Sequence, residues 1–239
     1  MGKVVYITGD VHYIGDTPLH MDEYKLAEQY IDIIEEYNAK ATLFVTGRCV
    51  AKHHSFWNWM AQKEYVELGA HTYKAFNLIN KVFDKLNGEP YGNYFYQYLD
   101  ILRTVRAFKK INYNPISWRT HSYASNNNTM KILPEFGFRI ISDRVEHCGK
   151  IKYNHRLVDV PINALNDDAV VVKRLGKKGV KVFRDTVLGD ILRGLAPITT
   201  QLHPLFMQKF DNFKTFHTLL EAFVEHGYTF KMLQELVER

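Results

Sequence analysis

The chain has 239 residues, of which 46% are hydrophobic and 24% charged, proportions close to those of soluble globular proteins. They argue against intrinsic disorder and fibrous repeats, and we expect one domain over residues 1–239. The net charge is +5, and the basic residues stand in short, scattered groups. We therefore expect no nucleic-acid partner, although a basic rim could attract an anionic sugar nucleotide or a lipid-linked phosphate.

The cysteines and the N-terminal residues bear on the cellular compartment. Cys49 and Cys148 lie far apart without metal-type spacing, which argues against a disulfide scaffold and against a cysteine-ligated zinc. Residues 3–7 enter a strand-like run at once, without a secretory leader. No apolar run reaches the roughly 18 residues that span a bilayer, so we expect a cytoplasmic protein without a transmembrane segment.

The pattern of apolar residues predicts strands that alternate with helices. In chain order we expect a strand at 4–8, a helix at 17–38, a strand at 41–47, a helix at 56–63, a strand at 65–69, a helix at 94–109, a strand at 116–119, a helix at 129–135, strands at 138–143, 157–161 and 170–172, a helix at 185–195, a strand at 198–202, a helix at 210–226, a strand at 227–230 and a helix at 231–237. The alternation indicates an α/β fold with a parallel sheet, and the number of strands favours a closed or partly open barrel.

Six polar side chains fall at or just beyond the ends of predicted strands: Asp10, His12, His71, Arg119, Asp143 and His203. The carboxyl ends of parallel strands meet at one edge of a barrel, where active sites are built. We therefore expect these side chains to meet over one mouth. Taken singly, each also has a structural interpretation, such as an aspartate that caps a turn or a buried histidine that bonds to backbone.

The residue types favour metal and proton-transfer chemistry. On extended backbone Asp10 and His12 point to the same side, so they could bind one divalent metal together, or one could hold the metal while the other takes a proton from water. His71 offers a second imidazole. Arg119 could orient a catalytic carboxylate or pair with a structural acid. His203 could protonate a leaving group.

Six segments resemble, in the same order, the motifs of the NodB-homology polysaccharide deacetylases, carbohydrate esterase family 4 (CE4): 7–12, 41–47, 67–73, 118–123, 198–204 and 227–230. Ile-Thr-Gly-Asp-Val-His at 7–12 is similar to the motif that carries a base aspartate and a metal-binding aspartate. Trp-Arg-Thr-His-Ser-Tyr at 118–123 is similar to the motif with the base-orienting arginine.

The resemblance implies a distorted or incomplete (β/α)7–8 barrel and metal-dependent removal of an acetyl group from an amino sugar. It would make Asp10 the catalytic base, Arg119 its orienting residue, His203 the general acid and His71 a metal ligand. A backbone N–H near Tyr123 is expected to hold the oxyanion. Four residues are expected to contact the substrate: Tyr73, His121, Tyr123 and Asp143.

Two positions depart from the family pattern. Ala75 stands where the metal motif has its second histidine, and a valine follows Asp10 where most members have an aspartate. In a variant branch the metal ligand lies two residues after the base, which here is His12. We expect Asp10, His12 and His71 to hold the metal, with His121 as a substitute for the missing histidine. Two imidazoles and a carboxylate favour Zn²⁺, with Ni²⁺ and Co²⁺ as alternatives.

Three functions fit these residues. The first is a metal-dependent deacetylase that removes an N- or O-acetyl group from a carbohydrate, such as a surface-polysaccharide precursor or a sugar nucleotide. The second is a catalytically silent carbohydrate-binding member of the family, and the third is a metallohydrolase of a small amide. Trp57 and Trp59 could stack on sugar rings, although a place in the core is the favoured interpretation for either.

Overall fold

One curled sheet organises the chain, whose computed structural model describes residues 2–13, 23–75, 85, 88, 90–154, 156–167 and 175–237. Its strands are β1 (Val4–Val11), β2 (Ala41–Val45), β3 (Val66–Ala70), β4 (Ser117–Trp118), β5 (Ile140–Ile141), β6 (Lys152–Tyr153), β7 (Val158–Asp159), β8 (Ile198–Gln201) and β9 (Thr229–Phe230). They run in the order β6-β7-β5-β4-β3-β2-β1-β8, and β9 also pairs with β1. Each described pair is parallel except β6 with β7.

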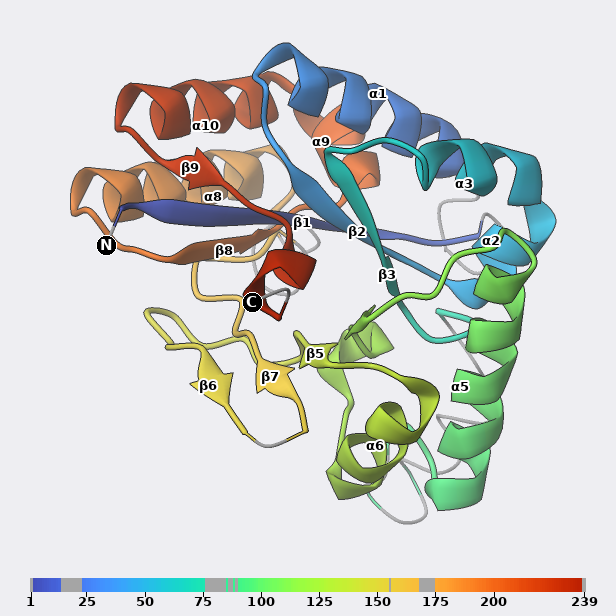
Figure 1. Ribbon diagram of the computed structural model, residues 1–239. Coiled ribbons are helices and arrows are strands. Elements are labelled where there is room, and N and C mark those ends of the chain that lie inside the picture. Colours follow the sequence, from blue (N-terminus) through green and yellow to red (C-terminus); the bar gives the residue numbers. More distant parts are fainter. Residues whose placement is uncertain are drawn as a thin grey trace.

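The sheet curls into a half-barrel, which confirms the expected distorted barrel (Figure 1). An irregular segment, 163–167, runs back from the β7 side to β8. The N–H groups of Asn163 and Ala164 donate to the carbonyl oxygen of Thr199, and that of Asp167 donates to the carbonyl oxygen of Gln201. Irregular backbone therefore lies beside β8 in place of a further regular strand.

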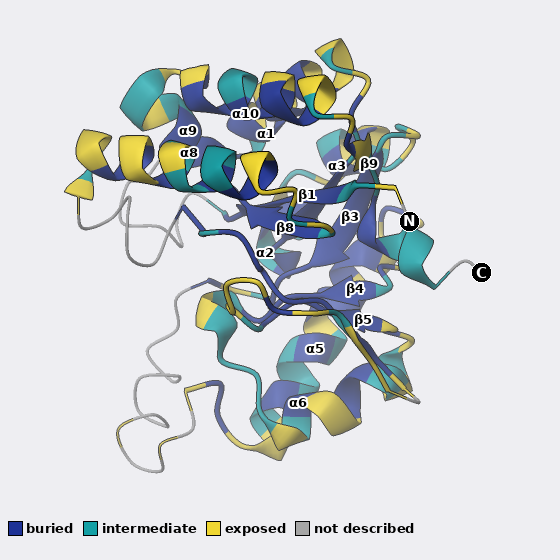
Figure 2. Ribbon diagram, turned by 90° about the vertical axis from the view of Figure 1, so that its left-hand side faces the viewer, coloured by how far each residue is buried: buried dark blue, intermediate teal, exposed yellow. Residues whose placement is uncertain are grey.

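Helices cover two flanks of the curled sheet. They are α1 (Glu23–Glu36), α2 (Gly47–Lys52), α3 (His54–Met60), α5 (Tyr94–Lys109), α6 (Asn127–Ile132), α8 (Lys177–Leu192), α9 (Pro204–Asp211) and α10 (Lys214–Glu225), with 3-10 turns η2 (His121–Tyr123), η3 (Leu133–Phe136) and η5 (Leu233–Leu236). Figure 2 shows α1, α8, α9 and α10 on one flank and α5 and α6 on the other. None of the helices in the described ranges is long and apolar enough to cross a bilayer.

The alternation along β1 separates the core from the barrel interior. Val5, Ile7 and Val11 belong to the main apolar cluster, which the helices cover. Tyr6 belongs to a second, smaller cluster. Side chains two apart on a strand share a face, so Asp10 lies on the same side as Tyr6, away from the helix-covered core.

Four predicted helices differ clearly from the observed ones. The helix predicted at 129–135 is α6 followed by the 3-10 turn η3, and the helix predicted at 185–195 is α8, which begins eight residues earlier at Lys177. The stretch predicted as one helix at 210–226 is two helices, α9 and α10, because Asn212 and Phe213 both adopt left-handed backbone, with φ of 52° and 62°. The helix predicted at 231–237 is a single 3-10 turn, η5. The N-cap predicted at Thr17 and the strand at 170–172 lie outside the described residues.

Candidate active site

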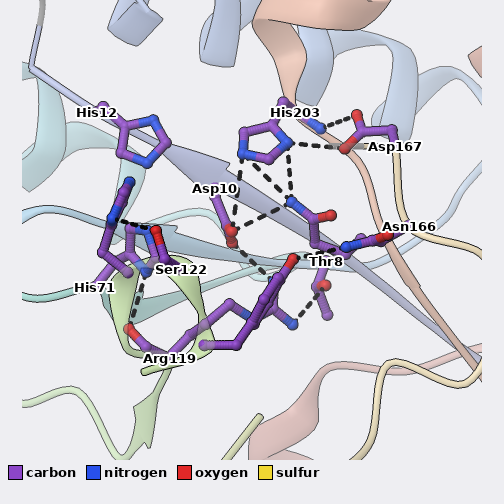
Figure 3. A network of polar contacts seen from close by, with 12 residues as sticks. Thr8, Asp10, His12, His71, Arg119, Ser122, Asn166, Asp167 and His203 are labelled. Atoms are coloured by element: carbon purple, nitrogen blue, oxygen red, sulfur yellow. Dashed lines mark hydrogen bonds and ion pairs between the residues drawn. The ribbon is translucent and has the colours of Figure 1, made fainter. Parts of the chain in front are cut away.

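Strand register brings the predicted residues to one edge of the sheet. Val11 pairs with Val45, Val45 with Ala70, Ala70 with Trp118 and Trp118 with Ile141, so these strands end side by side. The polar residues at the ends of these strands and of β8 are buried: Asp10, His12, His71, Arg119, Asp143 and His203. Figure 3 shows five of these six, all except Asp143, gathered in one polar network.

Three imidazoles gather at the mouth of the half-barrel. The ring centroids of His12 and His71 are 5.2 Å apart, and His121 lies 5.4 Å from the first and 5.5 Å from the second. Each ring offers one nitrogen, and these three atoms lie within 4.8 Å of one another. His12 follows β1, His71 follows β3, and His121 begins the 3-10 turn beyond β4. Three imidazole nitrogens at such spacing suit a transition metal, Zn²⁺ among them.

Hydrogen bonds fix the orientation of the two deeper rings. Nδ1 of His12 lies 3.0 Å from Oε2 of Glu23, and Nδ1 of His71 donates to the carbonyl oxygen of Arg119 at 2.9 Å. With Nδ1 occupied, each ring presents Nε2 as the ligand atom, an arrangement usual for metal-binding histidines. Nε2 of His12 is buried and has no hydrogen-bond partner among the described residues, so a metal would satisfy it.

The charge state of His71 also fits metal binding. Burial lowers the pKa of His71 to about 3, against the opposing attraction of Asp10. The ring is therefore neutral at physiological pH, and a histidine must be neutral to bind a metal. The residues present thus fit a metal centre of three histidines.

Glu23 is a functional candidate that the sequence did not reveal. Its Oε2 also accepts the backbone N–H of His12 at 2.7 Å, and its side chain is buried. Nothing in the periodicity of α1 marks this first-turn acid as different from its neighbours. The contact with His12 assigns it the role of holding that ring in place.

We expect Glu23→Gln to weaken Zn²⁺ binding by about 10- to 100-fold, the usual cost of losing the carboxylate behind a ligating histidine. Glutamine can still accept the backbone N–H of His12, so the fold should persist. Glu28→Gln, an exposed position on the same helix, is the matched control. Competition with a chromogenic chelator measures the affinity, and equal values for the two variants would contradict the role given to Glu23.

Asp10 and Arg119 form a buried ion pair beside the imidazoles. Nη1 of Arg119 donates to Oδ1 of Asp10 at 2.7 Å, and Nε2 of Gln201 donates to Oδ2 at 3.2 Å. Burial would raise the pKa of Asp10, but Arg119 and the nearby histidines outweigh it and hold that pKa well below its usual range. Asp10 is therefore an ionised carboxylate with both oxygens engaged.

Arg119 is itself fully constrained. Its Nε donates to the carbonyl oxygen of Ser142 at 2.9 Å, and its Nη2 donates to Oγ of Ser142 at 2.8 Å and to Oγ1 of Thr8 at 3.0 Å. The guanidinium carbon lies 4.2 Å from the centre of the Phe44 ring. Such a fork leaves the guanidinium one orientation, which positions the carboxylate of Asp10.

His203 lies across Asp10 from Arg119, and its partner is Asp167. Nδ1 of His203 is 2.8 Å from Oδ1 of Asp167, and the backbone N–H of His203 donates to Oδ2 of the same residue. Nε2 of His203 is 3.9 Å from Oδ2 of Asp10. Asp167 was not predicted, because it belongs to the irregular segment beside β8 rather than to a strand end. It holds the His203 ring with Nε2 toward Asp10.

Asp143 contacts the turn that carries His121. Its Oδ1 accepts the backbone N–H of Thr120 at 2.6 Å, while its Oδ2 is buried without a partner among the described residues. Burial raises the pKa of Asp143 to about 6. A substrate contact remains a prediction for this carboxyl.

The other predicted contacts are placed differently. The hydroxyl of Tyr123 accepts from Nδ2 of Asn166 at 3.1 Å, and its backbone N–H donates to the carbonyl oxygen of Thr120 at 2.9 Å. An oxyanion contact from another N–H near Tyr123 stays a prediction. Tyr73 lines a cavity between α2 and α5. Trp57 is buried in the core, and Trp59 is 42% exposed.

The group of candidate metal ligands in the structure differs in one member from the expected set. Ala75 is buried and offers no ligand atom, and His121 stands with His12 and His71 instead. Asp10 is not part of this three-histidine group, because its oxygens face Arg119 and Gln201. A direct bond from Asp10 to a metal stays a prediction.

Comparison with known proteins identifies the class to which this fold and site belong. The family model of polysaccharide deacetylases matches residues 1–141, and the chain belongs to that family. No curated protein matches the chain.

Solved structures with the same fold cover nearly the whole chain. A Mycobacterium smegmatis protein assigned to the polysaccharide deacetylases has a TM-score of 0.75 at 16% identity, over 100% of this chain and 90% of that one. PuuE allantoinase has a TM-score of 0.73 at 12% identity, over 98% and 89%. A CE4 pseudoenzyme of Bacillus anthracis has a TM-score of 0.65 at 17% identity, over 99% and 66%. At these identities the likeness establishes the fold alone.

Proposed function

We propose that this chain is a metal-dependent deacetylase that hydrolyses an N- or O-acetyl group on a carbohydrate. The observation that carries the proposal is that a candidate metal site and a proton-transfer site lie side by side at the carboxyl edge of the sheet. Three histidines present ligand atoms within 4.8 Å of one another, and an ionised, buried Asp10 lies beside them against His203. His12, His71 and His121 would hold the metal, and Zn²⁺ suits this ligand set best.

A bound divalent metal would supply Lewis acidity to the acetyl carbonyl and to the attacking water. Asp10 accepts the proton of that water as its oxygen attacks the carbonyl carbon. Arg119 keeps the carboxylate of Asp10 ionised and fixes its orientation. When the bond between the carbonyl carbon and the sugar nitrogen or oxygen breaks, Nε2 of His203 gives its proton to the leaving atom. Asp167 stabilises the imidazolium form of His203 through Nδ1, and the products are acetate and the deacetylated sugar.

Acetate release from a panel of acetylated sugars tests this function. The purified protein is treated with chelator and reloaded with Zn²⁺, Ni²⁺ or Co²⁺, and acetate is measured for N-acetyl and O-acetyl substrates. Release that depends on added metal is the expected result. Metal binding without release from any substrate would favour the silent carbohydrate-binding alternative, and no metal binding would overturn the proposal.

A small-amide hydrolase is the second candidate, and the structural likeness to PuuE allantoinase favours it. It needs the same metal and proton-transfer groups, so the metal test alone does not separate the two candidates. Adding small cyclic and linear amides without a sugar ring to the panel separates them. Turnover of these amides at a higher kcat/KM than of any acetylated sugar would select the second candidate.

We expect His203→Ala to keep the metal and to lower kcat by about 10²- to 10⁴-fold, the usual contribution of a positioned acid or base. His203 is absent from the three-histidine group, so its loss removes proton transfer and spares the ligand atoms. His54→Ala, at an exposed histidine of α3, is the control that should retain full kcat. Loss of metal from His203→Ala would contradict the division of roles.

A further inference from the structure

A second feature of the molecule lies outside the proton-transfer site. A cavity of about 560 Å³ opens between α2 and α5. Five cationic residues and a tyrosine line it: Arg48, Tyr73, Lys74, Arg103, Arg106 and Lys110. The described lining residues include no carboxylate. The volume falls within the range of small-molecule binding sites.

Helix geometry concentrates this charge on one side of the cavity. Arg103 and Arg106 lie on the same face of α5, three residues apart, and Lys110 follows four residues later at the end of the helix. All three are exposed. Like charges at such spacing repel each other, and a bound anion would relieve that repulsion.

Four of the five cations have no ion-paired carboxylate in the described part of the chain. No carboxylate in the described segments forms a salt bridge with Lys74, Arg103, Arg106 or Lys110. Asp100 is close enough for its charge to interact with that of Arg103. Its Oδ2, however, accepts from the backbone N–H of Tyr73 at 3.0 Å and from the hydroxyl of Tyr91 at 2.9 Å.

Backbone connections place the cavity next to the metal site. Tyr73 and Lys74 follow His71 within three residues, and the backbone N–H of Arg48 donates to the carbonyl oxygen of Tyr73 at 2.9 Å. The guanidinium of Arg48 also lies 4.6 Å from the ring centre of Tyr13, the residue after His12. The segment that carries His71 therefore continues directly into the wall of the cavity, and the residue after His12 packs against Arg48 of that wall.

A glycine fixes this wall. A Cβ added at Gly47 would lie 2.9 Å from Cα of Thr104 on α5 and 2.9 Å from the ring of Tyr73. These distances are shorter than a normal contact, so any side chain larger than that of glycine would clash at position 47. Glycine therefore allows α2, α5 and the segment after His71 to pack closely together. The elements that carry the cationic residues are thus held in place by close packing beside the histidines.

We propose that this basic cavity binds a phosphate or diphosphate group carried by the acetylated sugar. The inference rests on the proposed function, which it sharpens to a phosphate-bearing carbohydrate. Guanidinium groups pair with phosphate oxygens through two hydrogen bonds at once, and arginines supply three of the five cations here. A diphosphate, with more than one negative charge, matches five cations better than a single carboxylate does.

Direct binding tests the cavity independently of any catalysis. Calorimetry measures the affinity of the full chain for pyrophosphate, for uridine diphosphate and for glucuronate. The double variant R103Q/R106Q removes two charges and keeps good helix formers. We expect it to bind pyrophosphate about 10- to 100-fold more weakly than the unmodified chain. K109Q/K131Q, which removes two exposed lysines that do not line the cavity, should bind it unchanged.

Kinetics then separate the two proposals. If the chain is a deacetylase, R103Q/R106Q should raise KM for a uridine diphosphate N-acetyl sugar at least tenfold more than KM for the same acetylated sugar without phosphate. Pyrophosphate binding without any acetate release would overturn the deacetylase and leave the anion site standing. Equal pyrophosphate affinity in R103Q/R106Q and K109Q/K131Q, or binding of glucuronate alone, would overturn the phosphate site.

Discussion

Replacing His71 by alanine is expected to lower Zn²⁺ affinity by more than about 100-fold and to abolish metal-dependent acetate release. His71 is buried, neutral and held by the carbonyl oxygen of Arg119 with Nε2 toward the other two rings. Loss of a residue behind a ligand typically costs 10- to 100-fold, so loss of the ligand itself should cost at least as much. Metal content by elemental analysis and chelator competition provide the two measurements.

A pair of variants identifies the third ligand in the same assay. His121→Ala should also lose most of the affinity if three histidines form the centre. Asp10→Asn should keep the metal and lose turnover if Asp10 is the base. Retention of full affinity in His121→Ala, with loss in Asp10→Asn, would contradict the three-histidine centre and favour the set of Asp10, His12 and His71 instead. His54→Ala again serves as the surface control.

The positions of polar residues at the ends of predicted strands were enough to predict which side chains come together, for a simple physical reason. Parallel strands in register end at one edge, so residues that follow β1, β3, β4 and β8 converge whatever their distance along the chain. The alternation of a strand then puts Asp10 inside the half-barrel. Neither inference needs the tertiary structure, because both depend only on recognising apolar runs and their ends.

The parts that escaped prediction come from irregular backbone. Asp167 reaches His203 from a segment that bonds to β8 without being a strand, so it has no period that a sequence pattern could reveal. His121 was expected as a substitute ligand, but the turn that brings it beside His12 and His71 was not, and in this turn Ser122 and Tyr123 have φ of 59° and 55°. Residues other than glycine seldom adopt this conformation, so propensity gave no sign of the turn.

The helix predicted over 210–226 shows a similar limit. Phe213 and Phe216 both belong to the buried core, and so does Phe223 in the last turn of α10. The apolar pattern therefore continues across the break, although Asn212 and Phe213 turn the backbone into the left-handed region. Burial of side chains on both sides of a kink looks, in sequence, like one amphipathic helix.

Arg119→Met should destabilise the protein by about 3–5 kcal/mol, the cost of leaving one partner of a buried ion pair unpaired. Arg119 is completely buried, and its loss removes the cation that faces Asp10 and one hydrogen-bond donor each from Asp10, Thr8 and Ser142. Urea unfolding measures the change. Arg184→Met, which breaks an exposed pair with Asp185, is the control and should cost no more than about 1 kcal/mol.

The double variant D10N/R119M distinguishes the ion pair from simple packing of the arginine. If the cost of Arg119→Met arises from an uncompensated carboxylate, removing that charge as well should recover part of the lost stability. The double variant should then be more stable than the sum of the two single losses predicts, by roughly 1–3 kcal/mol. Additive losses would show that the guanidinium stabilises the protein through its packing against Phe44 and its bonds to Ser142 instead. In that case the ion pair between Arg119 and Asp10 would position the catalytic carboxylate without contributing to the stability of the fold.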